Sequence, residues 1–280
     1  MARLAAGTTL TGTSIFDPTL CESAYTWFAP RPGRAARRDN RPVIVLDPFA
    51  GGSVRGIVAA KLGLLYIGID MSSRQVRANK EQLCVCRDCA YAPEWIVGDG
   101  EDAVPLFRAA LQLPKYAGLG LAPETTQADM VLSCPPYFDL EQYGGGAADL
   151  SMLPSYEAFL AKYTRIIANV CSLLRTGHTA TFVVGNIREN KGDGRMLPLH
   201  MHTTQAFDKA GMVLVNDAVL LKPVGTGAMR ADRIMSAASK LVGVHQNVCV
   251  FSKGEMLTPA LARAVGIRSN NAEASQSSQQ

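Results

Sequence analysis

Short runs of apolar residues recur along the central part of the chain, and helical patterns separate them. The runs are apolar throughout instead of alternating, which is typical of parallel strands that are covered on both faces. In the segments between them, apolar residues repeat every three to four positions, as in amphipathic helices. The expected strands are 43–46, 65–70, 95–98, 129–132 and 179–185, and the expected helices are 55–62, 73–83, 102–111, 156–174 and 203–210.

The last part of the chain has a different pattern. Residues 212–222 and 247–252 are both strand-like, and no crossover helix pattern is evident between them. Two such strands without a crossover favour an antiparallel pair, here with a long connection over 223–246. The predicted fold class is therefore α/β and Rossmann-like, with a mainly parallel seven-stranded sheet that ends in an antiparallel C-terminal strand pair.

Composition agrees with one large domain. The chain has 280 residues, of which 48% are hydrophobic and 19% charged, so it can bury a sizeable core and global disorder is excluded. We expect a flexible N-terminus over 1–12, one domain over 13–255 and a C-terminal extension over 256–280. The extension ends in RSNNAEASQSSQQ, a polar stretch that predicts disorder from about residue 268.

Several features predict a cytoplasmic protein that is not inserted in a membrane. No apolar run approaches the ~20 residues needed to cross a bilayer. The first residues contain no apolar segment of the kind found in signal peptides. The seven cysteines are an odd number in a long chain, which favours reduced thiols over a disulfide framework. The net charge is only +4, but Arg supplies 19 of the 28 basic residues, so an anionic partner remains open.

Acidic residues follow three successive expected strands. Asp47 begins the turn Asp47-Pro48-Phe49-Ala50-Gly51-Gly52 after the first strand, Asp70 ends the second, 23 positions later, and Asp99-Gly100 follows the third. Small residues let a backbone approach a ligand closely, and a carboxylate after the second strand suits ribose hydroxyls. Each motif alone is compatible with an ordinary solvated turn, but three in succession favour a nucleoside site.

The loop chemistry disfavours phosphate as the ligand. The chain has neither GxGxxG nor GxxxxGK[ST], and acidic residues surround the loop. A cofactor that lacks phosphate and is cationic at its reactive end fits better. S-adenosylmethionine is such a molecule.

A second motif follows the fourth expected strand, in Ser133-Cys134-Pro135-Pro136-Tyr137-Phe138. Two prolines cannot extend a strand ladder, and they fix a rigid loop whose carbonyls are free to accept from a planar amino group. The ring of Tyr137 offers a face on which a base can stack. The catalytic candidates are Cys134, Pro135, Pro136 and Tyr137.

With these motifs in this order, the chain resembles the amino-group DNA methyltransferases, which modify adenine N6 or cytosine N4. The phage and prophage DNA methylases are the most similar in DPFAGGSVRG, in CPPYFDLE and in the late His245-Gln246-Asn247-Val248. The resemblance implies a class I methyltransferase fold, S-adenosylmethionine as cofactor, DNA as partner and a role in restriction–modification. It also implies that Ser14-Ile15-Phe16-Asp17-Pro18 is the family's N-terminal cofactor element, with Phe16 and Asp17 at the site.

The chain departs from the family pattern at two positions. Ser53 stands where a second loop glycine is expected, which leaves the loop path open. Cys134 stands where the family has Asp, Asn or Ser, and a thiol is a poor hydrogen-bond acceptor. The acceptor for the target amine is then absent, or comes from Ser133, Asp139 or Glu141.

The implied reaction is in-line methyl transfer to an exocyclic amine whose protons are held by the Pro135 carbonyl and a neighbouring side chain. The base is flipped out of the duplex and stacked on Tyr137. Adenine is slightly favoured because it is the commoner target, whereas a small residue before Pro-Pro leans toward cytosine. The alternatives are an inactive cofactor-binding module that associates with DNA, methylation of RNA or protein amines, and, with little support, a Cys134 thiolate that attacks a pyrimidine.

Basic residues near the expected carboxyl edge of the sheet are candidates for DNA contact. They are Arg188, Arg230, Arg233 and Lys240, and the Arg-rich segment 29–42 fits a phosphate contact and a solvated loop equally well. Cys84, Cys86 and Cys89 form CxCxxC, but no fourth ligand is evident nearby, so free thiols are favoured and no metal site is expected.

Overall fold

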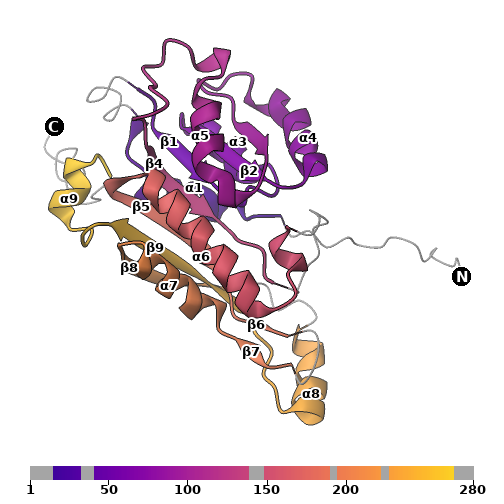
Figure 1. The fold of residues 1–280 in the computed structure, drawn as a ribbon. Coiled ribbons are helices and arrows are strands. Elements are labelled where there is room, and N and C mark those ends of the chain that lie inside the picture. The colour runs from indigo at the N-terminus through magenta and orange to yellow at the C-terminus, as the bar shows by residue number, and fades with distance from the viewer. Residues whose placement is uncertain (1–14, 33–40, 139–147, 190–193, 222–226, 268–280) are drawn as a thin grey trace, which may run out of the picture.

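The fold is organised around a seven-stranded sheet with strand order β3-β2-β1-β4-β5-β9-β8 (Figure 1). The computed structural model describes residues 15–32, 41–138, 148–189, 194–221 and 227–267. All neighbours from β3 to β5 are parallel, and β5–β9 and β9–β8 are antiparallel. The predicted Rossmann-like α/β class is confirmed. The strands are β1 (Ile44–Asp47), β2 (Leu65–Asp70), β3 (Glu94–Val97), β4 (Ala128–Ser133), β5 (Leu174–Val184), β8 (Met212–Leu221) and β9 (His245–Lys253).

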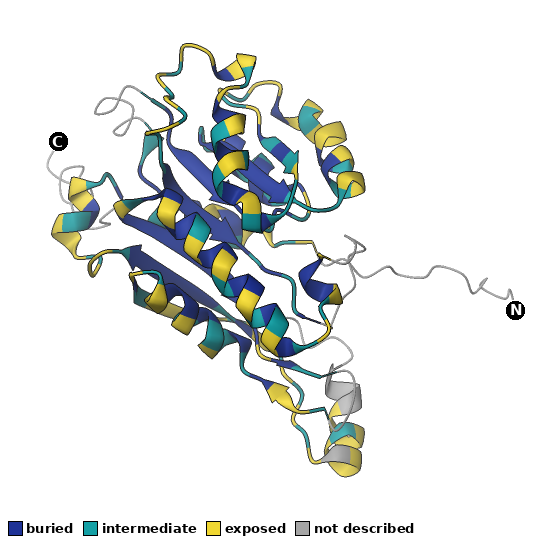
Figure 2. Ribbon diagram, viewed as in Figure 1, coloured by how far each residue is buried: buried dark blue, intermediate teal, exposed yellow. Residues whose placement is uncertain are grey.

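Helices cover both faces of the sheet, which explains why its strands are apolar throughout (Figure 2). Ile44 and Leu46 of β1 belong to a core on one face, and Val43 and Val45 belong to a core on the other. The first core is closed by α5 (Ala103–Leu111), α6 (Tyr156–Leu173) and α7 (Leu199–Lys209), and the second by α1 (Pro18–Phe28), α3 (Val54–Lys61) and α4 (Ser73–Glu81).

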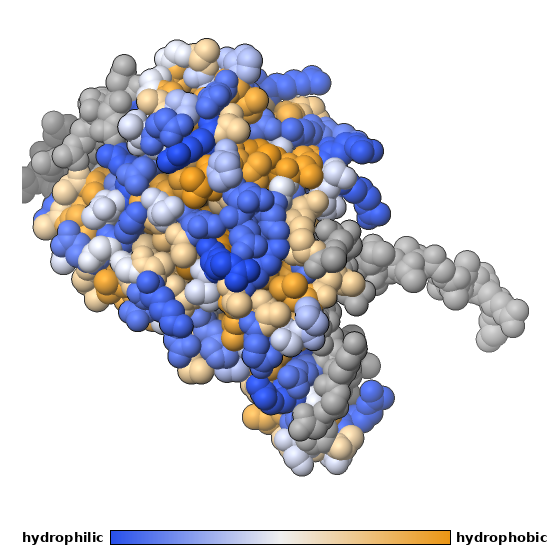
Figure 3. All heavy atoms as spheres, viewed as in Figure 1, coloured by the Kyte–Doolittle hydropathy of each residue, from blue (hydrophilic) through white to orange (hydrophobic). Residues whose placement is uncertain are grey.

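The expected helices and strands agree with the structure within a few residues, but the connection between the last two strands does not. It contains α8 (Gly227–Ala238), where we expected no helical pattern. The segment MRADRIMSAA is rich in helix-favouring Ala, Met and Arg, and it begins after a Gly-containing stretch that separates it from β8. The helix does not cross over the sheet, so β8 and β9 still pair antiparallel. It projects beyond the end of the sheet (Figure 1), and its described part shows both hydrophilic and hydrophobic residues at the surface (Figure 3).

A short hairpin lies beside this projecting part of the fold. It consists of β6 (Ile187–Arg188) and β7 (Met196–Leu197), which pair antiparallel after β5 ends. Sequence patterns did not reveal it because each strand has only two residues.

The C-terminal extension folds back onto the domain as far as residue 267. Its helix α9 (Pro259–Ala264) is capped by Thr258, and Ile267 is buried. Ile267 forms a β-bridge with Pro30, and the Arg31 amide donates to the Gly266 carbonyl at 3.0 Å. The predicted flexible N-terminus 1–12 and the tail from 268 lie outside the described residues. None of the described helices is both long and apolar enough to cross a membrane.

Candidate functional site

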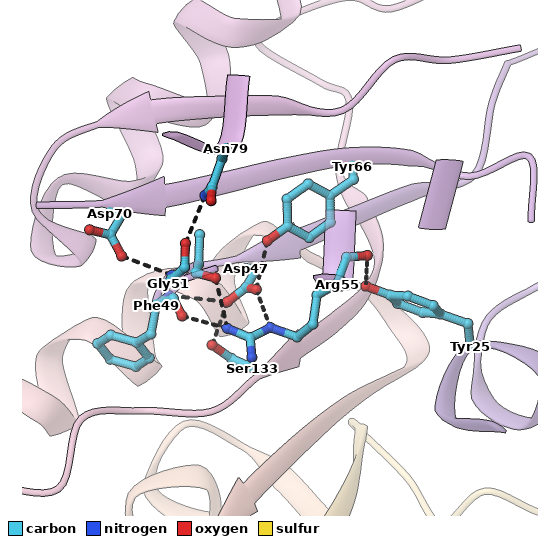
Figure 4. Close-up of polar contacts among 10 residues, drawn as sticks. Tyr25, Asp47, Phe49, Gly51, Arg55, Tyr66, Asp70, Asn79 and Ser133 are labelled. Carbon is cyan, nitrogen blue, oxygen red and sulfur yellow. Dashed lines mark hydrogen bonds and ion pairs between the residues drawn. The ribbon is translucent and has the colours of Figure 1, made fainter. Parts of the chain in front are cut away.

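A fully buried ion pair lies beneath the loop that follows β1. The Asp47 carboxylate has no exposed surface and accepts four hydrogen bonds. Its Oδ2 accepts from Arg55 Nε at 2.6 Å and from the Tyr66 hydroxyl at 2.7 Å. Its Oδ1 accepts from the Ser133 hydroxyl at 2.5 Å and from the Phe49 amide at 3.1 Å (Figure 4). Asp47, at the end of β1, is therefore hydrogen-bonded to β2, to the end of β4 and to the first turn of α3.

Protonation states follow from these contacts. Burial raises the pKa of Tyr66, and the Asp47 carboxylate raises it further, so the hydroxyl stays protonated and donates. Burial alone would lower the pKa of Arg55, but the adjacent Asp47 charge more than reverses this. The expectation that Asp47 presents its carboxylate to a ligand is corrected by its burial. All four strong acceptor positions are occupied from within the protein.

The same Arg55 shapes the backbone of the loop. Its Nη2 donates to the Phe49 carbonyl at 2.7 Å and to the Ala50 carbonyl at 3.0 Å, and Tyr25 donates to the Arg55 carbonyl at 3.0 Å. These contacts turn the two carbonyls inward to the guanidinium (Figure 4), and the next residues of the loop reach the surface, with Gly51 partly exposed and Gly52 exposed.

Gly51 is the point where the loop meets the end of β2. It has φ +50°, in the left-handed region that favours glycine. Its amide donates to Asp70 Oδ2 at 2.8 Å, and its carbonyl accepts from the buried Asn79 side chain of α4 at 2.7 Å. The Ser72 amide donates to the other Asp70 oxygen at 2.8 Å. Asp70 is partly exposed and lies beside the loop, as the sequence predicted, and burial raises its pKa although both backbone bonds oppose this.

The departure at Ser53 has a local explanation. Ser53 has φ −72° and ψ −15°, an ordinary helical conformation that needs no glycine. Its hydroxyl donates to Gln82 Oε1 at 2.7 Å, across the start of α3. A Cβ placed on Gly52 would meet no atom within 4 Å, so the open side of the loop is formed by Gly52 and not by Ser53.

Asp99, after β3, is bound by a residue that sequence reasoning missed. Lys162 of α6 donates to Asp99 Oδ2 and to the Ala148 carbonyl, and the Glu101 amide donates to Asp99 Oδ1 at 3.0 Å. The Lys162 side chain is 8% exposed. The signal in the sequence is a lysine within the apolar stripe of α6, between Phe159 and Tyr163.

Gly100 and Pro48 bring the loops after β3 and β1 into contact. A Cβ on Gly100 would lie 3.0 Å from the Pro48 carbonyl oxygen and 3.1 Å from Ile166. Phe49 packs at 6.0 Å from Tyr163 and 6.4 Å from Phe182, between ring centroids. Any larger residue at position 100 would therefore require Pro48 or Ile166 to shift, so glycine favours the close approach of the two loops.

The N-terminal element also reaches this region. The Phe16 ring lies over the Arg55 guanidinium, 4.6 Å from its carbon, and packs against the same core as α1. Asp17 caps α1, accepting from the Thr19 amide at 2.8 Å and the Leu20 amide at 3.3 Å. The structure thus places Phe16 at the loop, whereas Asp17 serves the helix start.

The loop after β4 continues the same edge of the sheet. Ser133 is fully buried and bonded to Asp47, so its hydroxyl does not face solvent, which corrects its candidacy as an acceptor. Pro135 is buried, while Cys134, Pro136 and Tyr137 are partly exposed. Asp139 and Glu141, the other two candidates, lie outside the described residues.

Tyr137 is held by a residue of β9. The buried Gln246 side chain donates to the Tyr137 hydroxyl. Burial raises the pKa of Tyr137, and Cys134 adds to this. Phe138 has φ +38°, unusual for a residue with a side chain, and its ring packs against Tyr156 and Phe159 at 5.6 and 5.7 Å. That packing holds the strained turn in place.

The basic candidates fall into two groups. Arg188 Nη1 donates to the Gly194 carbonyl at 3.4 Å, and a Cβ on Gly194 would clash with Lys240 Nζ, so both cations lie at the end of the β6–β7 hairpin. Arg233 is exposed on α8, and the Arg230 side chain lies outside the described part.

Within the Arg-rich segment 29–42, Arg41 has a structural partner. Its guanidinium binds both oxygens of buried Asp129 at 2.8 and 2.9 Å, next to the start of β1. Residues 33–40 lie outside the described part of the chain.

The seven cysteines all lie within the described residues, and no disulfide joins any of them. Cys84, Cys86 and Cys89 lie in and after η1 (Gln82–Cys86), and within the described ranges they do not converge into a metal-binding group.

Comparisons with known proteins give structural similarity only. A scan against protein families finds no match, and a search of curated proteins finds none. Among solved structures, TrmN from Thermus thermophilus is 15% identical with a TM-score of 0.45, covering 85% of this chain and 49% of its own. This chain therefore spans about half the length of that protein.

Two further solved structures are similar. Magnesium protoporphyrin IX methyltransferase from Synechocystis PCC 6803, solved with bound SAH, is 11% identical with a TM-score of 0.47, covering 84% of this chain and 82% of its own. A candidate DNA modification methylase from Thermus thermophilus is 18% identical with a TM-score of 0.37, covering 58% of this chain and 53% of its own.

We predict that Asp47→Asn strongly destabilises the fold. An amide in this position cannot accept four hydrogen bonds, and it leaves the buried Arg55 charge without a counter-ion, a change that typically costs about 3–5 kcal/mol. Urea unfolding followed by circular dichroism measures the difference. The control Asp88→Asn removes an exposed ion pair with Lys61 and should leave the transition unchanged. Equal stability of the two variants would contradict the central role of Asp47.

Proposed function

We propose that this protein transfers a methyl group from S-adenosylmethionine to the exocyclic amine of a flipped base in DNA, with adenine N6 favoured over cytosine N4. The observation that carries the proposal is the convergence of three loops at the carboxyl ends of adjacent strands β2, β1 and β4. These are the Asp70 turn, the glycine loop and the Pro-Pro-Tyr loop, joined by the Asp47–Ser133 and Gly51–Asp70 hydrogen bonds. In open α/β sheets this edge is the usual place for ligands.

The residues around Asp70 suit a nucleoside. Each Asp70 oxygen receives one backbone N–H and retains acceptor capacity toward the exposed side, which matches two ribose hydroxyls. The open space over Gly52 admits a ligand against the backbone. Phe16, Pro48, Phe49 and Gly100 would line the neighbouring wall. When bound, S-adenosylmethionine supplies an electrophilic methyl group on a sulfonium.

The Pro-Pro-Tyr loop suits a planar amine. The Pro135 carbonyl is followed by a residue without an N–H, so no local donor competes for it. Since Ser133 is committed to Asp47, the side-chain acceptor left in the described part of this loop, 133–138, is the Cys134 sulfur, which is weak. We infer that the Pro135 carbonyl is the main acceptor for the amine protons and that positioning supplies most of the acceleration.

The electrostatic interaction by which Cys134 helps to raise the Tyr137 pKa also bears on the rival thiolate mechanism. It gives the thiol a positioning role for the ring on which the base would stack. The inactive binding module remains the second candidate because Cys134 replaces the family's stronger acceptor. Methylation of RNA or protein amines would use the same loops, and the experiments below separate these outcomes.

The first prediction concerns the cofactor. Asp70→Ala should weaken S-adenosylmethionine binding about tenfold to a hundredfold, because charge-assisted hydrogen bonds of this kind contribute ~1.5–3 kcal/mol. Calorimetric titration measures the change. The matched control, Asp88→Ala, removes an exposed carboxylate elsewhere on the surface and should bind as the wild type does. Unchanged affinity in Asp70→Ala would show that Asp70 does not contribute to cofactor binding.

The second prediction distinguishes an enzyme from a binding module. The wild type is incubated with labelled S-adenosylmethionine and with DNA, RNA or protein, and nucleoside mass spectrometry identifies the product. Tyr137→Ala should remove ~1–3 kcal/mol of base stacking and reduce methyl transfer strongly while cofactor binding persists. Tyr137→Phe keeps the ring and should retain more activity than Tyr137→Ala.

The Cys134 variants complete this test. Cys134→Ser should retain or raise activity, because a hydroxyl accepts better than a thiol, and Cys134→Ala should cost little if Pro135 is the main acceptor. A thiolate mechanism predicts that both variants are inactive. A wild type that binds cofactor but methylates no DNA, RNA or protein favours the inactive module.

The third prediction concerns DNA. Replacing Arg188, Arg233 and Lys240 with Ala should flatten the salt dependence of DNA binding, lowering the slope of log K against log salt by about 0.9 for each lost phosphate contact. Arg108→Ala on the distant α5 is the control and should leave the slope unchanged. An unaltered slope in the triple variant would mean that other residues form the DNA-binding surface.

A further inference from the structure

Three potential metal ligands meet outside the proposed methyl-transfer site. His200 lies in the first turn of α7, Asp217 on β8 and Cys249 on β9. Asp217 and Cys249 are direct cross-strand partners in the β8–β9 ladder, so their side chains share a face of the sheet, and α7 packs over it. One donor atom from each residue lies within 4.8 Å of the other two.

The geometry of this group is unusual for a simple ion pair. His200 Nε2 lies 3.2 Å from Asp217 Oδ2, but this nitrogen is shielded from solvent and has no hydrogen-bond partner among the described residues. The two atoms are therefore close without an N–H directed at the carboxylate. The His200 nitrogen and the Asp217 carboxylate thus approach each other with no hydrogen bond between them, as two ligands of a common ion would.

The distances suit a small tetrahedral ion. Zinc binds N and O at about 2.0–2.2 Å and S at about 2.3 Å, so tetrahedral donors lie about 3.3–3.6 Å apart. The His200–Asp217 separation of 3.2 Å is close to that value. The Cys249 thiol donates to Asp217 Oδ1 over 4.0 Å, and the three donor atoms lie within 4.8 Å of one another, so the thiolate would have to approach by up to about 1 Å to complete a tetrahedral set.

Neighbouring residues hold the Asp217 carboxylate and the backbone of His200. Asn247 Nδ2 donates to Asp217 Oδ1 at 2.9 Å, and the His200 amide donates to the Asn186 side chain at 3.2 Å. Supporting hydrogen bonds of this kind fix the orientation of the ligands in metal sites. Cys249 is fully buried, whereas the His200 and Asp217 side chains are 25% and 36% exposed, which leaves a path from solvent at the edge strand β8 (Figure 1).

We propose that His200 Nε2, the Asp217 carboxylate and Cys249 Sγ bind a zinc ion, with water completing the coordination on the exposed side. A mixed sulfur, nitrogen and oxygen set selects zinc or a similar transition metal over calcium and magnesium, which prefer oxygen alone. The ion would join the start of α7 to the antiparallel β8–β9 pair. Binding replaces the thiol proton, which leaves to solvent as the Zn–S bond forms.

The test uses the full chain, freed of metal by dialysis against a chelator and titrated with Zn²⁺ by calorimetry. We expect one saturable site and a zinc-dependent rise in the midpoint of thermal unfolding that the chelator reverses. His200→Gln, Asp217→Asn and Cys249→Ala should each weaken zinc binding roughly a hundredfold or more and abolish the rise. The variants His245→Ala and Cys84→Ala alter the same residue types elsewhere and should bind zinc as the wild type does.

Cobalt gives a second readout that identifies the sulfur ligand. Co²⁺ in this site should show a thiolate charge-transfer absorption in the wild type that is absent in Cys249→Ala. Asp217 is partly exposed, so Asp217→Asn tests the site even if Cys249→Ala fails to fold. Absence of saturable zinc binding by the folded wild type would overturn the proposal, as would binding that survives in Asp217→Asn and is lost in Cys84→Ala.

Discussion

The position of the candidate site depends on one buried carboxylate. Asp47 accepts from Arg55, Tyr66, Ser133 and the Phe49 amide, which come from α3, β2, β4 and the loop itself. An isolated buried charge at this position would be very costly, but a charge with four donors and a paired guanidinium is tolerated. Few other arrangements of the surrounding residues would supply the same donors. Because Arg55 also binds the Phe49 and Ala50 carbonyls, the path of the glycine loop follows from the ion pair. The positions of the residues proposed to face the ligand therefore depend on the buried contacts of Asp47 and Arg55, which the proposed ligand does not touch.

The Pro-Pro-Tyr loop is held in place by contacts with β9 and α6. Gln246 lies at the start of β9, a strand that pairs antiparallel with β5, and its amide reaches the Tyr137 hydroxyl. Phe138 holds a left-handed backbone because its ring is packed between Tyr156 and Phe159 of α6. Ordering a flexible loop on binding costs conformational entropy. Contacts within the fold already order residues 134–138, so the proposed base would not have to order them. The antiparallel end of the sheet thus contributes to the geometry of the loop after β4.

Sequence patterns predicted the sheet because most of its parallel strands contain short apolar runs that amphipathic helices separate. They were wrong over 223–246, where no helical pattern was expected and α8 forms beyond the end of the sheet. They placed Asp70, Gly51 and Tyr137 correctly at one edge, but not the inward turn of Asp47, because strand-ending position says nothing of side-chain direction. The Lys162–Asp99 pair and the His200–Asp217–Cys249 group were missed for another reason. Their members are far apart in sequence and meet only through packing of α6 and of α7 with β8 and β9.

The three aspartates that follow successive strands illustrate how alike residues acquire different roles. Asp47 is neutralised by Arg55, and Asp99 is neutralised by Lys162. Asp70 receives only the Gly51 and Ser72 amides among the described hydrogen bonds, so its charge is oriented by backbone dipoles and not cancelled by a cation. Hydroxyl donors of a ribose would then meet a carboxylate that is partly desolvated and still has lone pairs to offer. Of the three, Asp70 is the one whose surroundings favour direct contact with a ligand, while the other two hold the loops on either side of it.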